Sequence, residues 1–305
     1  MIPDYQSIML PCLKIVGDKK EWAFHDLIEA LALKFNLNVD ERKTMLPSGA
    51  QRIFDNRVGW ARAYLKKAGL IESTRRGFVK ITQRGLDTLS QKPDIINVKF
   101  LKQFPEIKEY FITRRGTNDN DNENDETQEL SETPEELLET AYQKIRKSLA
   151  QELINKVIQL PPTFFEKLVV DLLVKMGYGG SLVDAGKAIG KTNDEGIDGT
   201  IKEDKLGLDI IYIQAKRWQP GSTVGRPEIQ KFVGALAGQG AKKGIFLTTS
   251  SFSKEAWEYQ PKNETKIVLI DGEQLAQMMI DHDLGVYPTN KYEIKKVDHD
   301  YFGDD

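Results

Sequence analysis

An apolar run, Leu208–Ile213, ends directly in the polar triplet Gln214-Ala215-Lys216. Short runs rich in isoleucine are typical of a buried β-strand. Side chains two residues apart in a strand face the same side, so we expect Gln214 and Lys216 to project together. Asp198 lies sixteen residues before Gln214. If Asp198 ends a neighbouring, paired strand, its carboxylate can meet the same face.

These three side chains are suited to phosphate chemistry. The Asp198 carboxylate and the Gln214 amide both offer oxygen ligands to a divalent cation. The Lys216 ammonium would then lie beside a scissile phosphate, where a positive charge stabilises developing negative charge or orients a water molecule. The pattern therefore indicates a metal-dependent phosphodiesterase.

Each of these residues also has an ordinary structural interpretation. Asp198 precedes a glycine, and such aspartates are common in turns. Gln214 and Lys216 could simply form a polar strand end, because a lone Gln-x-Lys triplet often occurs by chance. The catalytic interpretation depends on their spacing from Asp198 and on the surrounding sequence. The nearby Asp194 and Glu195 are expected to be loop residues.

Hydrophobic periodicity predicts a winged helix in the first part of the chain. The predicted helices cover 22–35, a short segment after Val39, 53–69 and 83–89, and the predicted hairpin strands cover 70–73 and 78–82. The turn of the hairpin contains Arg75-Arg76-Gly77. Three helices followed by a basic hairpin favour a winged helix.

The last part of the chain alternates helical and strand patterns. The predicted strands cover 196–202, 208–216, 244–249 and 266–270, and the predicted helices cover 165–176, 227–238, 253–259 and 273–281. Central strands with helices outside indicate an α/β domain built on a mixed sheet flanked by helices.

An acidic segment separates these two regions. Residues 116–133 are rich in Asn, Asp, Glu and Thr and cannot bury enough surface to offset their ordering entropy, so we expect a disordered linker. It could also repel DNA or cover the basic domain. Pro134 begins a helix that runs through Leu149 or beyond. The predicted organisation is a winged helix at 1–115, a linker at 116–133, a connecting helix at 134–159, an α/β domain at 160–290 and a tail at 291–305.

The net charge of −3 hides an uneven distribution. Residues 1–116 contain 21 basic and 13 acidic residues, a net charge of +8, whereas residues 117–139 contain ten acidic and no basic residues. A basic first domain is suited to a polyanion, although excess charge alone is weak support.

Composition excludes several classes of protein. Cys12 is the only cysteine, so the chain has no internal disulfide framework, and the three histidines lack the spacing of zinc ligands. The N-terminus lacks the features of a signal peptide, and no apolar stretch approaches the roughly 20 residues needed to span a bilayer. We therefore expect a soluble, cytoplasmic protein.

Several longer segments resemble one nuclease family. "FFEKLVVDLLVKMGYGG", "DEGIDGTI", "LGLDIIYIQAKRW", "EIQKFVGALAGQGAKKGIFLTTSSFSKEAWEY" and "KIVLIDGEQLAQMM" resemble the PD-(D/E)xK catalytic domain of Mrr-type restriction endonucleases, in the variant with glutamine at the second acidic position. "NRVGWARAYLKKAGLIESTRRGFVKIT" resembles their winged-helix N-terminal domain. The resemblance covers nearly the whole chain in one order.

This resemblance implies a type IV, methylation-dependent endonuclease that cuts double-stranded DNA containing methyladenine or methylcytosine. It implies magnesium held by Asp198 and Gln214, with the Ala215 carbonyl, and Lys216 beside the phosphate. A neutral glutamine binds magnesium more weakly than a carboxylate. Cutting both strands requires two active sites, so a homodimer or higher oligomer is expected on the DNA, and the protein would then be associated with the nucleoid.

Glu166 has two competing interpretations. In similar nucleases a glutamate of this helix lies near the metal. Alternatively, Thr163-Phe164-Phe165-Glu166 fits a capping box, in which the glutamate closes the start of its helix.

The winged-helix interpretation also predicts DNA contacts. The candidates on the third helix are Arg57, Arg62 and Lys66, with Lys67 and Trp60 nearby, and those on the hairpin are Arg75, Arg76 and Lys80. Ordinary solvated charge, with Trp60 in the core, is the alternative.

Three polar residues outside the triplet have open roles. Gln230 could face the active site or simply lie exposed on its helix. Ser250 and Ser251 could contact a phosphate, although capping of the next helix is the favoured role.

Two rival functions share most of these features. One is a repair or recombination nuclease that recognises DNA structure. The other is a DNA-binding regulator whose nuclease fold is silent, but such a protein would have no need of Asp198, Gln214 and Lys216.

Overall fold

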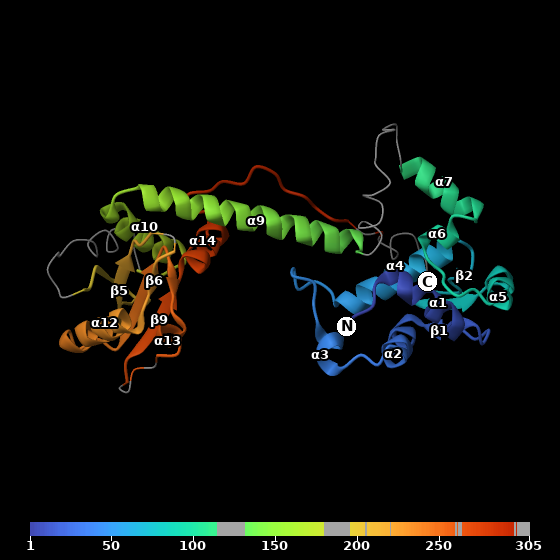
Figure 1. Ribbon diagram of the computed structural model, residues 1–305, viewed down its shortest axis with the longest axis horizontal. Coiled ribbons are helices and arrows are strands. Elements are labelled where there is room, and N and C mark those ends of the chain that lie inside the picture. The colour runs from blue at the N-terminus through green and yellow to red at the C-terminus, as the bar shows by residue number, and fades with distance from the viewer. Residues whose placement is uncertain are drawn as a thin grey trace. The chain divides into compact units, whose positions relative to one another are not determined.

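The computed structural model describes residues 1–114, 132–179, 196–204, 206–219, 221–259, 261, 264–295 and 297 (Figure 1). The chain divides into two compact units, Met1–Gln143 with Ile294–Asp305, and Lys144–Glu293. The predicted linker at 116–133 lies outside the described residues except for Glu132 and Thr133, and so do Asp194 and Glu195. None of the described helices is long and apolar enough to cross a membrane.

The first unit is mainly helical, with a small antiparallel sheet (Figure 1). Its elements are α1 (Tyr5–Val16), β1 (Trp22–Ala23), α2 (Phe24–Lys34), α3 (Val39–Lys43), α4 (Ile53–Lys67), β2 (Ile71–Glu72), β3 (Phe78–Ile81), α5 (Gln83–Ser90), α6 (Val98–Leu101) and α7 (Pro105–Arg114). The strands have the order β1-β3-β2. Trp22 pairs with Val79, and Ile71 pairs with Ile81.

Helix α1 forms the centre of this unit, and the periodicity analysis did not predict it. It packs against α4, α2, β3 and α5, and Ile8, Met9 and Leu13 are completely buried. The Asp4 carboxylate caps it by accepting hydrogen bonds from the amides of Gln6 and Ser7. A helix that is apolar on most sides belongs in a core, so it lacks the amphipathic pattern that marks a surface helix.

The remaining predicted elements of this unit are present with shifted ends. The first predicted helix began at Trp22, whereas Trp22 and Ala23 pair with β3 and the helix starts at Phe24. Helix α4, the hairpin of β2 and β3, and α5 lie where the sequence placed them. The winged helix remains our interpretation of this order of elements.

The second unit contains a four-stranded mixed sheet, as predicted. Its elements are the end of α9 (Pro134–Gln159), followed by α10 (Pro162–Lys175), β4 (Gly199–Lys202), β5 (Ile210–Lys216), β6 (Thr223–Val224), α12 (Arg226–Gly238), β7 (Lys243–Thr248), β8 (Ser251–Phe252), α13 (Lys254–Trp257), β9 (Lys266–Ile270) and α14 (Gly272–Asp281). The strand order is β4-β5-β7-β9, with β4 antiparallel to β5 and the other pairs parallel. Strands β6 and β8 form a separate parallel pair.

Helices cover both faces of the four-stranded sheet (Figure 1). On one face, Ile213, Ala215 and Leu247 pack with buried residues of α9, α10 and α14. On the other face, Phe246 packs with Phe232 of α12 and with α13. Gly244 of β7 permits the close packing of α12 on this face, because a Cβ atom at this position would lie 2.7 Å from the Phe232 ring. Alternate residues of β5 therefore belong to different cores, and only its last residues carry polar side chains.

Candidate active site and DNA-contact residues

The chain segment before β4 brings Asp198 onto the end of β5. The Asp198 amide donates a hydrogen bond to the Ile213 carbonyl at 2.8 Å, and Gly199 continues the pairing opposite Ile213. The Asp198 Oδ2 accepts a hydrogen bond from the Ala215 amide at 2.7 Å. The carboxylate thus contacts the backbone of the residue that separates Gln214 from Lys216.

Gln214 and Lys216 lie on the same face of β5, as strand geometry requires. Gln214 is buried, with 4% of its surface exposed, and Lys216 is half-buried. Gly196, with φ of +105°, approaches the Gln214 side chain closely, since a Cβ atom there would lie 3.1 Å from Nε2. Both the backbone conformation and the lack of space favour glycine at this position.

Thr248, the last residue of β7, and the following Thr249 bond to the backbone at Lys216 and Trp218, and the sequence analysis did not identify these two threonines. Lys216 lies opposite Thr248 in the parallel pairing of β5 with β7, and the Thr248 hydroxyl donates to the Lys216 carbonyl at 2.8 Å. The Thr249 hydroxyl accepts from the Trp218 amide at 2.9 Å and donates to the Trp218 carbonyl at 2.7 Å. The only sequence signal was a pair of threonines at the end of an apolar strand.

Glu166 lies in α10, and the capping-box interpretation is wrong. The helix begins at Pro162 with Pro161 as its N-cap, so Thr163 is inside the helix and no side chain caps it. The pKa of Glu166 is raised above its ordinary value of 4.5, first because burial disfavours the charge and then because Asp198 repels it, while Lys216 opposes the shift. Glu166 therefore shares an electrostatic environment with the residues at the end of β5.

The available donors at this site are oxygen atoms. The described part of the chain contains no group of three His, Cys, Asp or Glu side chains that could hold a metal ion. A cation here would depend on Asp198, the Gln214 amide, the Ala215 carbonyl and Glu166, with water completing its shell. Such a set fits a hard cation such as magnesium. A cation would also relieve the repulsion between Glu166 and Asp198. The side chains at this site therefore suit a divalent cation.

In the first unit, Arg57 has partners that conflict with the predicted DNA contact. Its Nε and Nη2 atoms each lie 2.9 Å from a Glu136 carboxylate oxygen, and Nη1 donates to the carbonyls of Ile2 and Pro3 at 2.9 and 3.0 Å. Only 18% of its side chain is exposed. All three guanidinium nitrogens therefore join parts of the protein to one another, and we correct the expected role of Arg57 to a structural one.

The other candidates on α4 differ in their surroundings. The Arg62 guanidinium lies 4.1 Å from the centre of the Phe24 ring, and burial lowers its pKa. Lys66 and Lys67 are exposed, and the Lys67 ammonium lies 2.9 Å from the centre of the Tyr110 ring. Trp60 is half-buried, and its indole N–H donates to Glu135 at 2.6 Å. The exposed cations on this helix are therefore the two lysines near its end.

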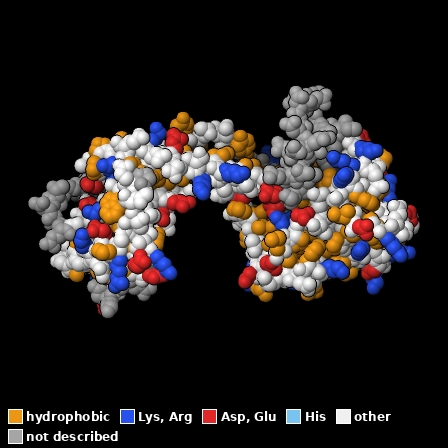
Figure 2. Space-filling model, in the orientation of Figure 1, with side chains coloured by type: hydrophobic (Ala, Val, Ile, Leu, Met, Phe, Trp, Pro, Cys, Tyr) orange, Lys and Arg blue, Asp and Glu red, His pale blue; other side chains and the backbone are white. Residues whose placement is uncertain are grey.

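The hairpin presents its basic residues to solvent. Arg75 is exposed, stacks 3.7 Å from the centre of the Phe78 ring and lies 3.6 Å from a Glu21 carboxylate oxygen. Arg76 is exposed and Lys80 is half-buried. Figure 2 shows Lys and Arg side chains interspersed with hydrophobic and acidic ones on the visible face of this unit.

The three polar residues with open roles lie in the second unit. Gln230 is exposed on α12. Neither Ser250 nor Ser251 caps the following helix, because the Ser253 side chain accepts from the Ala256 amide and caps α13. Ser250 instead donates to the Ser222 carbonyl. Both Ser250 and Ser251 line a cavity of about 270 Å³ together with Lys147 and Thr249.

Comparison with known proteins gives matches in both units. Residues 5–91 match the Mrr N-terminal domain, and residues 157–279 match the Mrr restriction endonuclease domain. The type IV methyl-directed restriction enzyme EcoKMrr of Escherichia coli (strain K12) is 38% identical over 316 residues, which cover 99% of each chain.

Two solved structures were also matched over parts of their lengths. The MspJI restriction endonuclease in complex with a 27-mer oligonucleotide has a TM-score of 0.33 and 24% identity, over 44% of this chain and 31% of that chain. The DNA modification-dependent restriction endonuclease AspBHI has a TM-score of 0.36 and 15% identity, over 46% of this chain and 36% of that chain. On the full-length identity to EcoKMrr and the two domain matches, the chain belongs to the Mrr family of restriction endonucleases.

Proposed function

We propose that this protein is a type IV restriction endonuclease that hydrolyses phosphodiester bonds of methylated double-stranded DNA. The hydrogen bond from the Ala215 amide to Asp198 is the observation that carries this proposal, because it fixes a carboxylate between Gln214 and Lys216. The full-length similarity to a methyl-directed restriction enzyme supports the choice of methylated DNA as substrate. Such an enzyme would act in the cytoplasm and would be associated with the nucleoid while it is bound to DNA.

Asp198 and Gln214, with the Ala215 carbonyl, would hold a magnesium ion, and Glu166 would add a ligand directly or through water. When bound, magnesium stabilises negative charge on the phosphate and the leaving oxygen. Asp198 has one oxygen held by the Ala215 amide, so it presents the other in a fixed direction. The Lys216 ammonium would orient the attacking water and stabilise the charge that develops on the pentavalent phosphate.

The first unit would bind the DNA through its exposed basic residues. Lys66 on α4 would contact the backbone or a base edge, and Arg75, Arg76 and Lys80 of the hairpin would contact phosphate. Arg62 contributes less, because its guanidinium is half-buried against Phe24. Arg57 is left out of the interface because its nitrogens are occupied.

The exposed part of α9 offers a surface for a second copy of the chain. Leu138, Tyr142 and Ile145 are 48, 50 and 66% exposed and follow at spacings of four and three residues, as in a coiled-coil seam. Glutamates precede the middle of this stripe and basic residues follow it. Antiparallel pairing sets Leu138 against Ile145 of the second copy and opposes unlike charges. We infer a homodimer that brings two active sites to one DNA.

The first prediction concerns the residues that act on the phosphate. Lys216→Ala and Asp198→Asn should each lower the rate of cutting of a methylated plasmid with magnesium by about two to three orders of magnitude, because each removes charge stabilisation in the transition state. Binding of the same DNA should remain. Lys254→Ala, which removes an exposed lysine of α13, should cut at the parent rate. Undiminished cutting by Lys216→Ala would remove the lysine from the mechanism.

The same plasmid separates the rival functions. Cutting that depends on methylation supports the proposed function. Equal cutting of methylated and unmethylated plasmid would favour a structure-specific repair or recombination nuclease. Binding without any cutting by the parent protein would favour a silent regulator.

The second prediction concerns Glu166. Glu166→Gln should lower cutting while leaving the metal-free protein as stable as the parent or slightly more stable at pH 7. The raised pKa means that folding favours the protonated carboxyl, so the charged form costs stability. The difference in melting temperature should vanish below pH 4.5, where the glutamate is protonated in both states, and grow as the pH rises through the folded pKa. Glu166→Gln that cuts like the parent would leave this residue outside the site.

The third prediction concerns the hairpin. Arg75→Ala together with Arg76→Ala should weaken DNA binding and lower the slope of log K against log salt concentration by about one for each lost phosphate contact. Lys34→Ala together with Lys43→Ala removes the same charge from α2 and α3 and should leave the slope closer to that of the parent. An unchanged slope in the arginine variant would exclude the hairpin from the interface.

The fourth prediction concerns the proposed dimer. Ile145→Glu should reduce the mass measured by sedimentation to that of one chain and turn linear plasmid products into nicked circles. Thr140→Glu adds the same charge on the opposite face of α9 and should behave like the parent. A dimeric Ile145→Glu protein that still linearises plasmid would reject this surface.

A further inference from the structure

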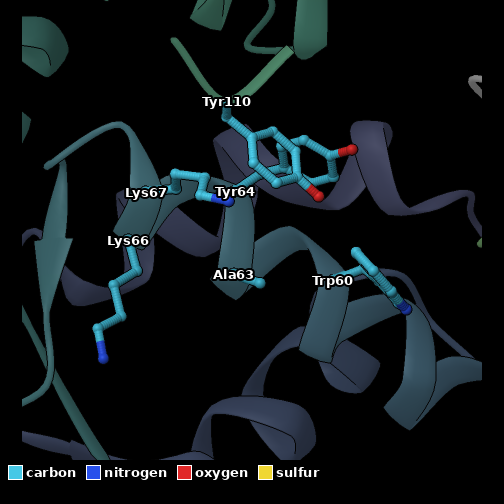
Figure 3. A pocket seen from close by; sticks show the side chains of 6 residues that line it. All are labelled: Trp60, Ala63, Tyr64, Lys66, Lys67 and Tyr110. Carbon is cyan, nitrogen blue, oxygen red and sulfur yellow. The ribbon is translucent and has the colours of Figure 1, made fainter. Parts of the chain in front are cut away.

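One face of α4 bears an aromatic pocket that the proposed function has not used. Ala63 and Tyr64 each lie three or four residues from both Trp60 and Lys67, so these four residues line a single face of the helix, and Tyr110 of α7 joins them (Figure 3). Lys66 also lines the pocket. Trp60 and Tyr110 lie on different sides of Ala63 in this view, so the small, exposed alanine leaves a space between large rings.

The aromatic rings of this pocket are held by their neighbours. Tyr64 stacks on Tyr5 of α1 with ring centres 5.6 Å apart, and Trp60 lies 6.2 Å from Tyr64. The Trp60 indole N–H donates to Glu135 at 2.6 Å. These contacts fix two walls before any ligand arrives, which lowers the entropic cost of binding.

The volume of the pocket indicates the size of its occupant. At about 420 Å³ it falls within the range of roughly 300–1,000 Å³ typical of sites that bury a whole small molecule. A single methyl group projecting from a stacked base is comparable to one water molecule, about 30 Å³, and would leave most of the space empty. The pocket is therefore large enough for an entire planar ring.

The charges around the pocket favour a nucleic acid as the source of that ring. Lys66 and Lys67 are exposed in the pocket lining, and the Lys67 ammonium lies 2.9 Å from the centre of the Tyr110 ring. Lysines bind backbone phosphates, while flat aromatic side chains stack on bases that have left the helix. The same helix carries the exposed residue Lys66 that we assign to the DNA interface, so base and backbone would be engaged by one element.

We propose that this pocket receives the methylated base after it is extruded from the duplex. The inference rests on the proposed function and assigns its specificity to Trp60, Tyr64 and Tyr110. Stacking on the aromatic rings of the pocket offsets the stacking free energy that the base loses when it leaves the duplex. The added methyl group fills space against the rings, and one such group in an apolar pocket changes affinity by roughly 10- to 200-fold. A pocket that recognises a methyl group by contact accepts methyladenine and methylcytosine alike.

The test uses DNA in which every context is modified. One duplex is amplified with ordinary nucleotides, with N6-methyl-dATP in place of dATP, or with 5-methyl-dCTP in place of dCTP, and binding is measured without divalent cation. Ala63→Met fills the pocket from its exposed floor, and Trp60→Ala removes a wall. Each should reduce the preference for modified DNA by roughly tenfold or more. Ala237→Met, at an exposed position of α12, is the matched control.

The outcomes separate this inference from the proposed function. A parent protein without any preference for modified DNA overturns both. If the parent protein prefers modified DNA and both Ala63→Met and Trp60→Ala keep that preference within twofold, the role of the pocket is overturned and the proposed function stands.

Extrusion has its own readout. Cleavage positions on the modified duplex define a short synthetic site, in which the modified base is then paired or mispaired. A mispaired base leaves the helix more easily, so the parent should bind that duplex several-fold more tightly. Weaker binding to the mispaired site would show that the methyl group is read within the intact duplex, against the proposal.

Discussion

The hydrogen bond between the Ala215 amide and the Asp198 carboxylate sets the direction of the carboxylate on which the proposed active site depends. Asp198 lies just outside the paired region of β4, where its amide still bonds to Ile213 and its side chain is already free to turn along β5. A one-residue shift of β4 against β5 would send the carboxylate to the opposite face, because strand side chains alternate. The pairing register of β4 and β5 therefore decides whether the Asp198 carboxylate lies on the same face as Gln214 and Lys216. Burial of Ile201, Ile211 and Ile213 on the core side fixes that register.

Charge on α4 serves the structure as well as the proposed interface. Arg57 and Glu136 form a largely buried pair, with 18% and 9% of their side chains exposed, and removing one partner of such a pair leaves a buried charge without compensation. The pair ties the start of α9 to α4 and to the carbonyls of the N-terminal segment. Glu135 and Thr133 reinforce the junction through Trp60 and Asn56. Arg57, which precedes Trp60 on α4, thus holds the helix against its neighbours, while Lys66 and Lys67 remain exposed.

Sequence reasoning was strongest where a periodic pattern coincided with a sharp change in polarity. Strand β5 and its ending at Gln214 and Lys216 follow from such a change. It failed where packing decided the outcome. Helix α1 has apolar residues on most sides because other elements surround it, and its interior Pro11 obscured the pattern further.

Local motifs were the least reliable guide, because several residues competed for each role. Thr163 resembled an N-cap, but Pro161 and Pro162 set the backbone angles of the helix start first. Ser250 and Ser251 precede a helix, but Ser253 caps it, and Ser250 bonds to a loop that is distant in sequence. Glu166 does not cap its helix. Its pKa is set by burial and by the charges of Asp198 and Lys216. Two carboxylates and one lysine then share a site in which the glutamate resists ionisation. A divalent cation would reverse that resistance, so cation binding and the ionisation of Glu166 are expected to favour each other.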